Sequence, residues 1–452
     1  MQTFHVRLFS WIVELPVSGL TQILAGRIVA LVLVLGSAAL TVFLAHDLMR
    51  QGLLGKVDSM KAALAGLLAA AALLTSGFMT VHAASFRSDP VLAFLLMAAL
   101  TVLFTCKTSV FWLSIAVLCA SLALVISVKA TLWLPAFVAA LIWRSREPGV
   151  TLRMVVAGLL VLPVAGAFIW GHSLGLNSEE TESSASSLSD ALTTGLLSSG
   201  LVPRQAELLL WVSYTLPGLA GAAFAFSLLS RRSETRPKVR AHLTLLHIVA
   251  PVASVLIYRN AFPYFFPFIS PPLMVAAGMG LAQMSGKTVK FLILPIMAVS
   301  VVGQGVRSVG ESNEYQRMTI DALRRMFPTP VAYIERSAAL PDYQKLGPFL
   351  SGWGLQKYRE ASIPVFATQI TRRQPPFVLA TSLELLAALE GRHSAKSGLL
   401  LDDQIALSQN YVHFSGPVWL AGKKVTVGHE PIATTLLIGG RYRLESDEAV
   451  IV

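Results

Sequence analysis

Carboxylates and cations at the ends of apolar runs are the residues of this sequence best placed for chemistry, because a charge buried in hydrocarbon is costly. Asp89 opens the apolar run that follows FRSDP, with Arg87 two residues before it. A carboxylate there could bind a substrate hydroxyl or remove its proton. It could equally cap a helix, since Ser88 or Asp89 followed by Pro90 is typical of a helix N-terminus. Both roles stay open, and they are compatible.

The stretch RNAFPYFFPFISPP (259–272) joins a guanidinium to aromatic rings and prolines. Arginine binds phosphate oxygens through two parallel N–H groups and is always charged. We predict that Arg259 and Asn260 contact the phosphate of a lipid, and that Tyr264 belongs to a wall of rings along its chain. The four prolines would bend this helix and open a cavity. An aromatic belt beneath a snorkelling arginine is the alternative interpretation.

Lys129 lies between two apolar runs and is a further candidate contact for a phosphate. Its aliphatic stem could instead let the ammonium group reach the outer surface of a membrane. The segment 173–206 is rich in serine and carries four acidic residues: Glu179, Glu180, Glu182 and Asp190. These carboxylates could hold a divalent cation or an acceptor, although the composition favours a solvated loop. No other feature of the sequence indicates a cofactor.

The composition is that of a membrane protein. Of the 452 residues, 54% are hydrophobic and 13% are charged, and the mean hydropathy is +0.64, whereas soluble domains carry about 25% charged residues. The net charge is +11, but the basic residues are scattered between apolar runs and form no stripe of the kind that binds nucleic acid. The two cysteines, Cys106 and Cys119, stand in apolar stretches and are predicted to be buried thiols.

The elements that must position these residues are apolar helices, because a membrane-crossing helix needs about 20 mostly apolar residues. We predict an α-helical polytopic membrane domain over residues 25–304. Ten segments qualify: 26–45, 62–82, 90–105, 109–128, 130–143, 154–171, 208–229, 241–258, 262–283 and 288–304.

Short loops rich in Lys and Arg are typically cytoplasmic. Three loops fit that rule: 144–153, 231–240 and 287–290. Counting helices from them puts four stretches on the opposite, extracytoplasmic side: 86–90, Lys129, 173–206 and 259–260. The candidate site residues therefore fall on one side of the membrane, as does the C-terminal third of the chain.

Residues 305–452 have no long apolar run and are predicted to form an extracytoplasmic mixed α/β domain that ends in β-strands. A helix over 314–326 would place Tyr315, Met318, Ala322 and Met326 on one face. PTPVAYIE reads as a strand. PPFVLATSLELLAALE reads as a strand, a Thr381 or Ser382 cap and a helix. YVHFSGPVWLAGKKVTVG and TTLLIGGRYRLES read as strands joined by glycine turns.

Residues 1–24 are predicted to form an interfacial amphipathic helix that includes His5, Arg7 and Glu14. The same count of helices places this segment on the extracytoplasmic side without a preceding signal. We therefore expect that a first helix is missing before Met1, and that the chain is also cut short at its C-terminal end.

Six stretches, in order, carry a family resemblance: HVRLFSWIVELP, FRSDPVLAFLLMAAL, KATLWLPAFVAALIWR, RNAFPYFFPFISPPLMVAAG, YVHFSGPVWLAGKK and GGRYRLES. Together they resemble the GT-C superfamily of polytopic glycosyltransferases. More narrowly, they resemble bacterial relatives of the protein O-mannosyltransferases and the aminoarabinose transferase. The resemblance covers nearly the whole chain, and its weight comes from the order of the stretches rather than from any one of them.

The resemblance implies transfer of a sugar from a polyprenyl-phosphate donor to a lipid, glycan or protein acceptor on the outer face of the membrane, usually with inversion. In that family an acidic residue in the first external loop acts as the base. This sequence departs from the pattern there, because Glu14 is the one acid in the region and matches no catalytic position. Asp89 corresponds to a carboxylate of the second loop, and Lys129 and Arg259 correspond to phosphate contacts.

Two other functions fit the same topology. A transporter or flippase for lipid-linked sugars would need inverted repeats and charges near the middle of the bilayer, and the sequence shows neither. A non-catalytic membrane scaffold would bind partners through the C-terminal domain.

Overall fold

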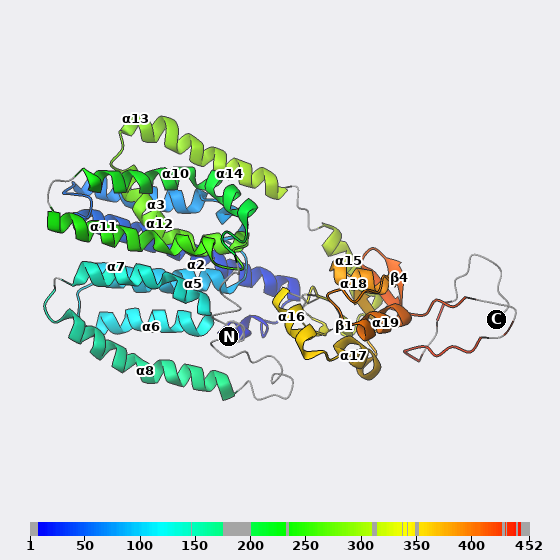
Figure 1. Ribbon diagram of the computed structural model, residues 1–452. Helices are drawn as coiled ribbons and strands as arrows, with labels where there is room; N and C mark the ends of the chain where they lie inside the picture. The colour runs from blue at the N-terminus through cyan, green and yellow to red at the C-terminus, as the bar shows by residue number, and fades with distance from the viewer. Residues whose placement is uncertain are drawn as a thin grey trace. The chain divides into compact units, whose positions relative to one another are not determined.

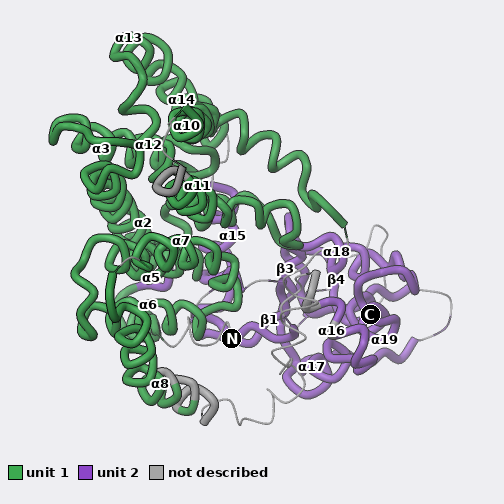
Figure 2. Tube along the Cα trace, turned by 60° about the vertical axis from the view of Figure 1, so that its left-hand side comes forward, with its two compact units in different colours: residues 1–17, 21–311 green, residues 18–20, 312–452 purple. Residues whose placement is uncertain are grey.

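The chain forms two compact units, one of residues 1–17 and 21–311 and one of residues 18–20 and 312–452 (Figure 2). The computed structural model describes residues 8–145, 147–174, 200–231, 235–309, 314–336, 338–340, 342–348, 352–426, 430, 432–439 and 442–443. The second unit begins at residue 312, a few residues after the boundary predicted at residue 305.

The first unit is a bundle of apolar helices, and every one of the ten predicted segments is helical (Figure 1). Its elements are α2 (Gly19–Arg50), α3 (Ser59–Thr75), α4 (Met79–His82), α5 (Ser88–Thr105), α6 (Val110–Ile126), η2 (Val128–Trp133), α7 (Leu134–Arg144), α8 (Val150–Leu174), α10 (Gln205–Ser230), α11 (Thr235–Val249), η5 (Ala250–Leu256), η6 (Pro263–Phe265), α12 (Phe266–Leu281), α13 (Gly286–Thr288), a π-turn (Val289–Ile293) and α14 (Leu294–Val309).

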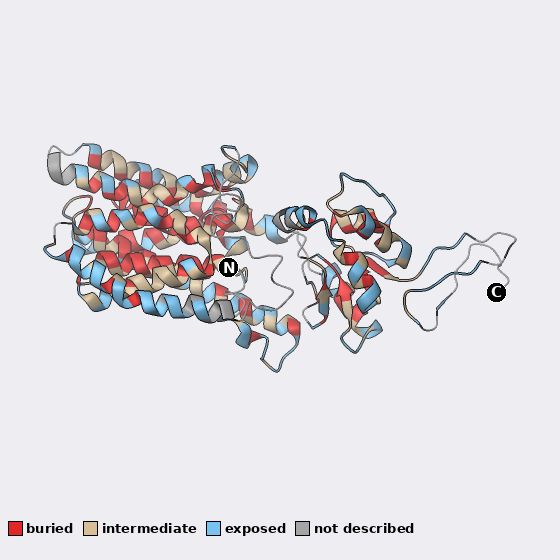
Figure 3. Cartoon of the chain, turned by 60° about the horizontal axis from the view of Figure 1, so that its bottom comes forward, coloured by how far each residue is buried: buried red, intermediate tan, exposed pale blue. Residues whose placement is uncertain are grey.

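Six helical segments of the described chain are long and apolar enough to cross a membrane: 19–50, 88–105, 205–230, 239–256, 263–281 and 286–308. Three more apolar helices are shorter: 59–75, 110–126 and 150–164. Large apolar side chains such as Val32, Leu159 and Val302 are exposed on the outside of this bundle. A protein that exposes such a surface along its helices is a membrane protein, and Figure 3 shows the buried residues concentrated inside it.

Helix α12 is the centre of the bundle, and it packs against α3 and α10 at the distance that only small residues allow. A Cβ atom added to Gly280 would lie 1.9 Å from the carbonyl oxygen of Gly221 on α10. One added to Gly278 would lie 2.3 Å from the carbonyl oxygen of Ala65 on α3. The AAGMG sequence of α12 therefore sets the spacing of three helices.

The N-terminal segment differs from the predicted amphipathic helix over residues 1–24. Its described part contains a 3₁₀ turn (Ser10–Ile12), and α2 starts at Gly19. Pro16 has no N–H with which to continue a helix. The side-chain amide of Gln22 donates hydrogen bonds to the carbonyls of Val13 (2.9 Å) and Leu15 (3.2 Å), which holds the segment against the start of α2.

The second unit is a mixed α/β fold around a five-stranded sheet of order β2-β1-β3-β5-β4. Its strands are β1 (Ala332–Ile334), β2 (Gln344–Leu346), β3 (Phe377–Leu379), β4 (Tyr411–Ser415) and β5 (Val418–Ala421). Its helices are α15 (Glu314–Met326), α16 (Gly352–Ala361), α17 (Val365–Arg373), α18 (Leu383–Leu389) and α19 (Leu401–Asn410). Strands β2, β1 and β3 are parallel, and β5 and β4 continue the sheet as an antiparallel hairpin.

The predicted strand in PTPVAYIE is confirmed, as are the strand, cap and helix in PPFVLATSLELLAALE. Ser382 follows β3 and caps α18, because its hydroxyl accepts the N–H of Leu385 at 3.3 Å. Glu335, directly after β1, is fully buried, and its carboxylate accepts hydrogen bonds from the hydroxyl of Thr381 and the N–H of Ala339. Burial lowers the pKa of the Lys345 ammonium. The hydrogen bonds of Glu335 therefore connect the loop after β1 with the loop after β3.

Helix α15 forms as predicted. Its buried residues are Ile320 and Leu323, and Tyr315 and Met318 on the predicted face are exposed. The helix carries two apolar faces, and a periodic pattern cannot show which of them meets the core. No strand is found in the described residues 432–439 and 442–443, where the glycine-linked strands were expected.

Candidate active site

Chain segments that are far apart in sequence meet at one end of the helical unit, which we call the Asp89 end. The carboxylate of Asp89 at the start of α5 binds the ammonium of Lys129 in η2. The N–H of Val202 donates to the carbonyl of Leu256 at 2.8 Å. The guanidinium of Arg204 lies 4.0 Å from the ring centre of Phe262. Segments 86–90, 127–130, 202–204 and 256–264 are therefore neighbours, as the prediction of a common side requires.

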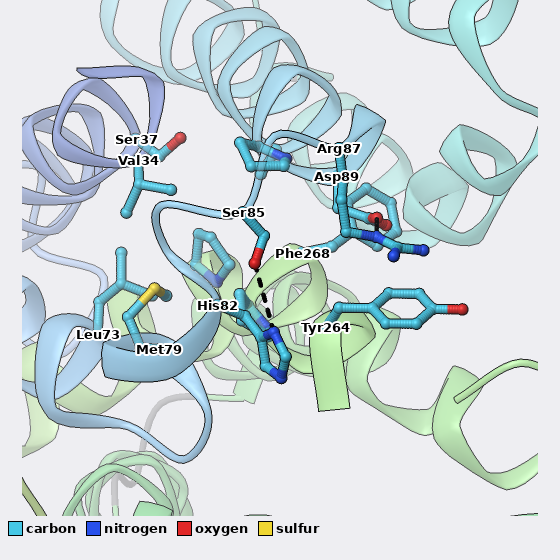
Figure 4. Close-up of a pocket in the computed structure, with 14 residues that line it drawn as sticks. Val34, Ser37, Leu73, Met79, His82, Ser85, Arg87, Asp89, Tyr264 and Phe268 are labelled. Atoms are coloured by element: carbon cyan, nitrogen blue, oxygen red, sulfur yellow. Dashed lines mark hydrogen bonds and ion pairs between the residues drawn. The ribbon is translucent and has the colours of Figure 1, made fainter. Parts of the chain in front are cut away.

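A pocket of about 390 Å³, counting space open to solvent, lies at the Asp89 end (Figure 4). Its polar residues are Ser37, His82, Ser85, Arg87, Asp89 and Tyr264. Its apolar residues are Val34, Leu73, Met79, Pro90, Ala93, Pro267, Phe268 and Pro271. They come from α2, α3, α4, the start of α5, η6 and α12, so the pocket has an apolar body with charged groups at one place in its wall.

Asp89 is 3% exposed and is the buried charge of this pocket. One carboxylate oxygen, Oδ1, accepts the ammonium of Lys129. The other, Oδ2, lies 3.6 Å from the Nε of Arg87, which is an ion pair but too long for a hydrogen bond. Oδ2 has no hydrogen-bond partner among the described residues. Leaving a buried charged oxygen without a hydrogen bond costs free energy, so the geometry provides an acceptor for a ligand hydrogen.

The aromatic ring of Tyr264 carries the cations of the site. The guanidinium of Arg87 lies 3.6 Å above its centre, and the ammonium of Lys129 lies 5.9 Å from it. Phe262 stacks beside Tyr264 at 5.8 Å and carries Arg204. Cation–π contacts of this kind hold a positive charge in place without neutralising it. Three cations and one carboxylate leave two net positive charges around the rings of Tyr264 and Phe262, and Tyr264 lines the pocket.

The rings of the 259–272 stretch divide into two groups with different roles. Phe262 and Tyr264 are half-buried and hold the cations. Phe265, Phe266 and Phe268 are buried in the bundle, where Phe266 stacks on Trp211 at 5.2 Å. Pro271 lacks the N–H that would bind the carbonyl of Pro267, one turn earlier in the pocket wall.

Arg259 and Asn260 do not line this pocket, and neither do Lys129 and Arg204, although Lys129 binds Asp89 in its wall. Arg259 is exposed, in the turn between η5 and η6. Asn260 is half-buried, and its side chain hydrogen-bonds Tyr258, which in turn lies close enough to Asp89 to feel its charge. The structure thus brings together Asp89, Lys129, Arg87 and Tyr264, and it places Arg259 nearer to solvent.

The fold of the chain is similar to that of two solved structures. Crystal structures of ArnT from Cupriavidus metallidurans, one bound to undecaprenyl phosphate and one in the apo state, each align with a TM-score of 0.55 over 88% of this chain and 86% of theirs. The chain therefore has the fold of ArnT. Sequence identity to both is 16%. No family model matches the sequence, and no curated protein matches it either.

Sequence reasoning missed Arg204. It lies near the end of the serine-rich segment 173–206 and directly precedes α10, and its position as the last cation before an apolar helix was the available signal. The acidic residues proposed as cation ligands, Glu179 to Asp190, lie outside the described residues. Among the residues that are described, no group of three His, Cys, Asp or Glu side chains could hold a metal ion.

Proposed function

We propose that this protein transfers a sugar from a polyprenyl-phosphate donor to an acceptor on the extracytoplasmic face of the bacterial cytoplasmic membrane. One observation carries the proposal: Asp89, a buried carboxylate in the wall of an apolar pocket, has one oxygen without a hydrogen bond and contacts the cations Lys129 and Arg87. The likeness in fold to ArnT, one of whose structures holds undecaprenyl phosphate, supports a lipid-linked donor.

The apolar part of the pocket suits the first isoprene units of such a donor, and the cations suit its phosphate. A phosphodiester that links a sugar to a polyprenol carries one negative charge. The phosphate monoester left after transfer carries close to two at neutral pH. Two net positive charges fixed at the site therefore favour the charge that develops as the bond to the sugar breaks, which is the condition for electrostatic catalysis.

The transfer balances with Asp89 as the proton acceptor. The acceptor hydroxyl gives its proton to Oδ2, its oxygen bonds to the anomeric carbon, and the bond from that carbon to the phosphate oxygen breaks. The electron pair stays on the phosphate, facing Arg87, Arg204 and Lys129. Lys129 now binds Asp89, and a phosphate that draws the ammonium away would leave the carboxylate freer to take a proton.

The basic residues define the sidedness that we propose. Arg144, Arg153 and Arg240 gather at the other end of the bundle, where Arg153 donates to the carbonyl of Thr108 at 3.1 Å and Arg240 lies over Trp143. By the rule that basic loops are cytoplasmic, that end faces the cytoplasm and the Asp89 end faces outward. The second unit, which follows α14, would then also be extracytoplasmic.

Binding of undecaprenyl phosphate by the full chain in lipid nanodiscs tests the donor site. We expect binding that exceeds that of undecaprenol at least tenfold, and a tenfold or larger loss in Lys129→Ala. The matched control is Lys107→Ala, because Lys107 is an exposed lysine at the opposite end of α5. Equal binding of the phosphate and the alcohol would contradict the proposal, as would an equal loss in the control.

Release of polyprenyl phosphate from a panel of polyprenyl-phosphate sugars, measured by mass spectrometry, tests the reaction itself. We expect release from at least one donor when membranes supply the acceptor, and none from Asp89→Asn. Binding of the donor without release of product from any member of the panel would favour transport or a scaffold function.

A further inference from the structure

Helix α15 has an apolar face that the rest of its own unit leaves uncovered. Tyr315, Met318 and Met326 are 62%, 63% and 38% exposed. With Ala322 they recur at helical spacing and form one side of the helix; we call these four residues the Tyr315 face. Ile320 and Leu323, on a different side of the helix, are buried against the sheet. The core of the unit therefore does not account for the Tyr315 face.

The Tyr315 face is held in a fixed position rather than hanging loosely from the unit. A Cβ atom added to Gly416, in the β4–β5 turn, would lie 2.0 Å from the hydroxyl oxygen of Tyr315, so that turn passes directly beside the phenol. Gly416 has a φ of +54°, which favours glycine. Arg324 at the other end of the helix pairs with Asp342 at 2.5 Å. Phe414, in the strand that leads to the same turn, is 55% exposed.

Chain connectivity keeps the start of α15 close to the end of α14. Helix α14 belongs to a segment that is long and apolar enough to cross a membrane, and it ends at Val309. Helix α15 begins at Glu314. Five Cα-to-Cα steps can span at most about 18 Å even when fully extended. A helix that starts so close to the end of a membrane helix lies within reach of the lipid headgroups.

The chemistry of the Tyr315 face suits that surface. A tyrosine and methionines with arginines beside them are typical of helices that lie in the headgroup layer, where the rings enter the apolar boundary and the guanidinium groups meet lipid phosphates. Arg325 is exposed on α15 and lies about 20° around the helix from Met318. We propose that α15 lies on the membrane surface with its Tyr315 face against lipid, and so fixes the second unit to the bilayer. This inference is independent of the sugar-transfer reaction.

A depth-dependent quenching experiment on the full chain tests this proposal. Cys106 and Cys119 are free and are first replaced by alanine. Met318→Cys is then labelled with an environment-sensitive fluorophore. The protein is reconstituted in nanodiscs of phosphatidylcholine with one third phosphatidylglycerol, with and without a lipid that carries a nitroxide on its headgroup. We expect the nitroxide lipid to quench the label at position 318 at least twofold.

Gln316→Cys is the matched control, because Gln316 is also exposed on α15 but lies about 160° around the helix from Met318. We expect little quenching at position 316. Equal, weak quenching at both positions would overturn the proposal and leave the Tyr315 face in water. A blue-shifted label at position 318 that the nitroxide lipid does not quench would also overturn it, since a protein surface would then cover the face.

Discussion

The two ends of the helical unit are both rich in charge, but they use it differently. At one end, Arg144 donates to the carbonyls of Leu103 (2.8 Å), Phe104 (2.8 Å) and Cys106 (2.6 Å) and pairs with Glu147. Glu147 also accepts the hydroxyl of Thr108 at 2.6 Å. At the other end, Asp89 keeps an oxygen without a hydrogen bond, and cations rest on aromatic rings.

The difference separates structure from function. Helix α5 runs between the two ends, about 27 Å apart for its 18 residues. Arg144 donates to the last carbonyls of α5, which have no partner within the helix, so its charge stabilises the fold. Around Asp89, by contrast, one carboxylate oxygen accepts no hydrogen bond from the described residues, and the two cations Lys129 and Arg87 share this single carboxylate. Unused polar capacity in a pocket is what a ligand can bind.

The largest effect of a substitution is expected at the Asp89 end. Asp89→Asn keeps the shape of the side chain but removes its charge, and we expect the rate of sugar transfer to fall at least about 100-fold, the smallest usual contribution of a positioned general base. The measurement is release of polyprenyl phosphate at saturating donor. Asp47→Asn, a carboxylate at the C-terminal end of α2 that bonds Gln51, is the control and should keep its rate. A variant at position 89 with normal turnover would remove the proton acceptor from the mechanism.

Much of this site followed from sequence, and what did not follow depends on packing. Counting helices from the basic loops put Arg87, Asp89, Lys129 and Tyr264 on one side, because hydropathy and charge fix topology. The same count could not show that Lys129, 40 residues from Asp89, would bind its carboxylate. That contact depends on the 3₁₀ turn η2, which follows the Ser127 cap and returns the chain towards α5.

The second unit shows the same limit. The strand, cap and helix over 377–389 could be read from local signals, since Ser382 bonds a residue only three positions away. The order of the sheet could not, because the hairpin β4–β5 joins the parallel strands through β3, at a separation in sequence of about 40 residues. The Tyr315 face was recognised by its spacing, but its exposure depends on a turn at Gly416.

The Arg144 end should respond in stability rather than in binding. Arg144→Met leaves the carbonyls of Leu103 and Cys106 without this donor, whereas Gln51 still donates to Phe104 and Thr108 still donates to Glu147. We expect a loss of about 2–3 kcal/mol, less than for a fully buried pair. The apparent melting temperature of the protein should fall by several degrees, while undecaprenyl phosphate should bind the folded fraction with unchanged affinity. Arg50→Met, an exposed arginine at the end of α2, should change neither property. Loss of binding in folded Arg144→Met would mean that the two ends are coupled.

Helix α12 contributes to both binding and stability. Its first half lines the pocket, and its second half sets the distance to α3 and α10. Gly280→Ala places a methyl group 1.9 Å from a backbone oxygen of α10, so the helices must separate. We expect a cost of about 1–3 kcal/mol, as for overpacking in a tight core, seen as a lower melting temperature. Gly286→Ala is the control, since no atom lies within 4 Å of the added carbon. Equal stability of the two variants would show that α10 and α12 can part freely.

The smallest effect is expected for Arg259, which remains a proposed phosphate contact although it lies outside the pocket. Because its side chain is exposed, its attraction for a phosphate is screened by water and salt. We expect Arg259→Ala to weaken binding of undecaprenyl phosphate about twofold to threefold at low salt, and less at 0.5 M salt. Arg204→Ala, measured in parallel, should cost more, because Phe262 holds that guanidinium and stacks beside Tyr264, which lines the pocket. The reverse order would place the phosphate at the turn 259–260 rather than beside the Tyr264 ring. The binding site at the Asp89 end would then lie outside the pocket.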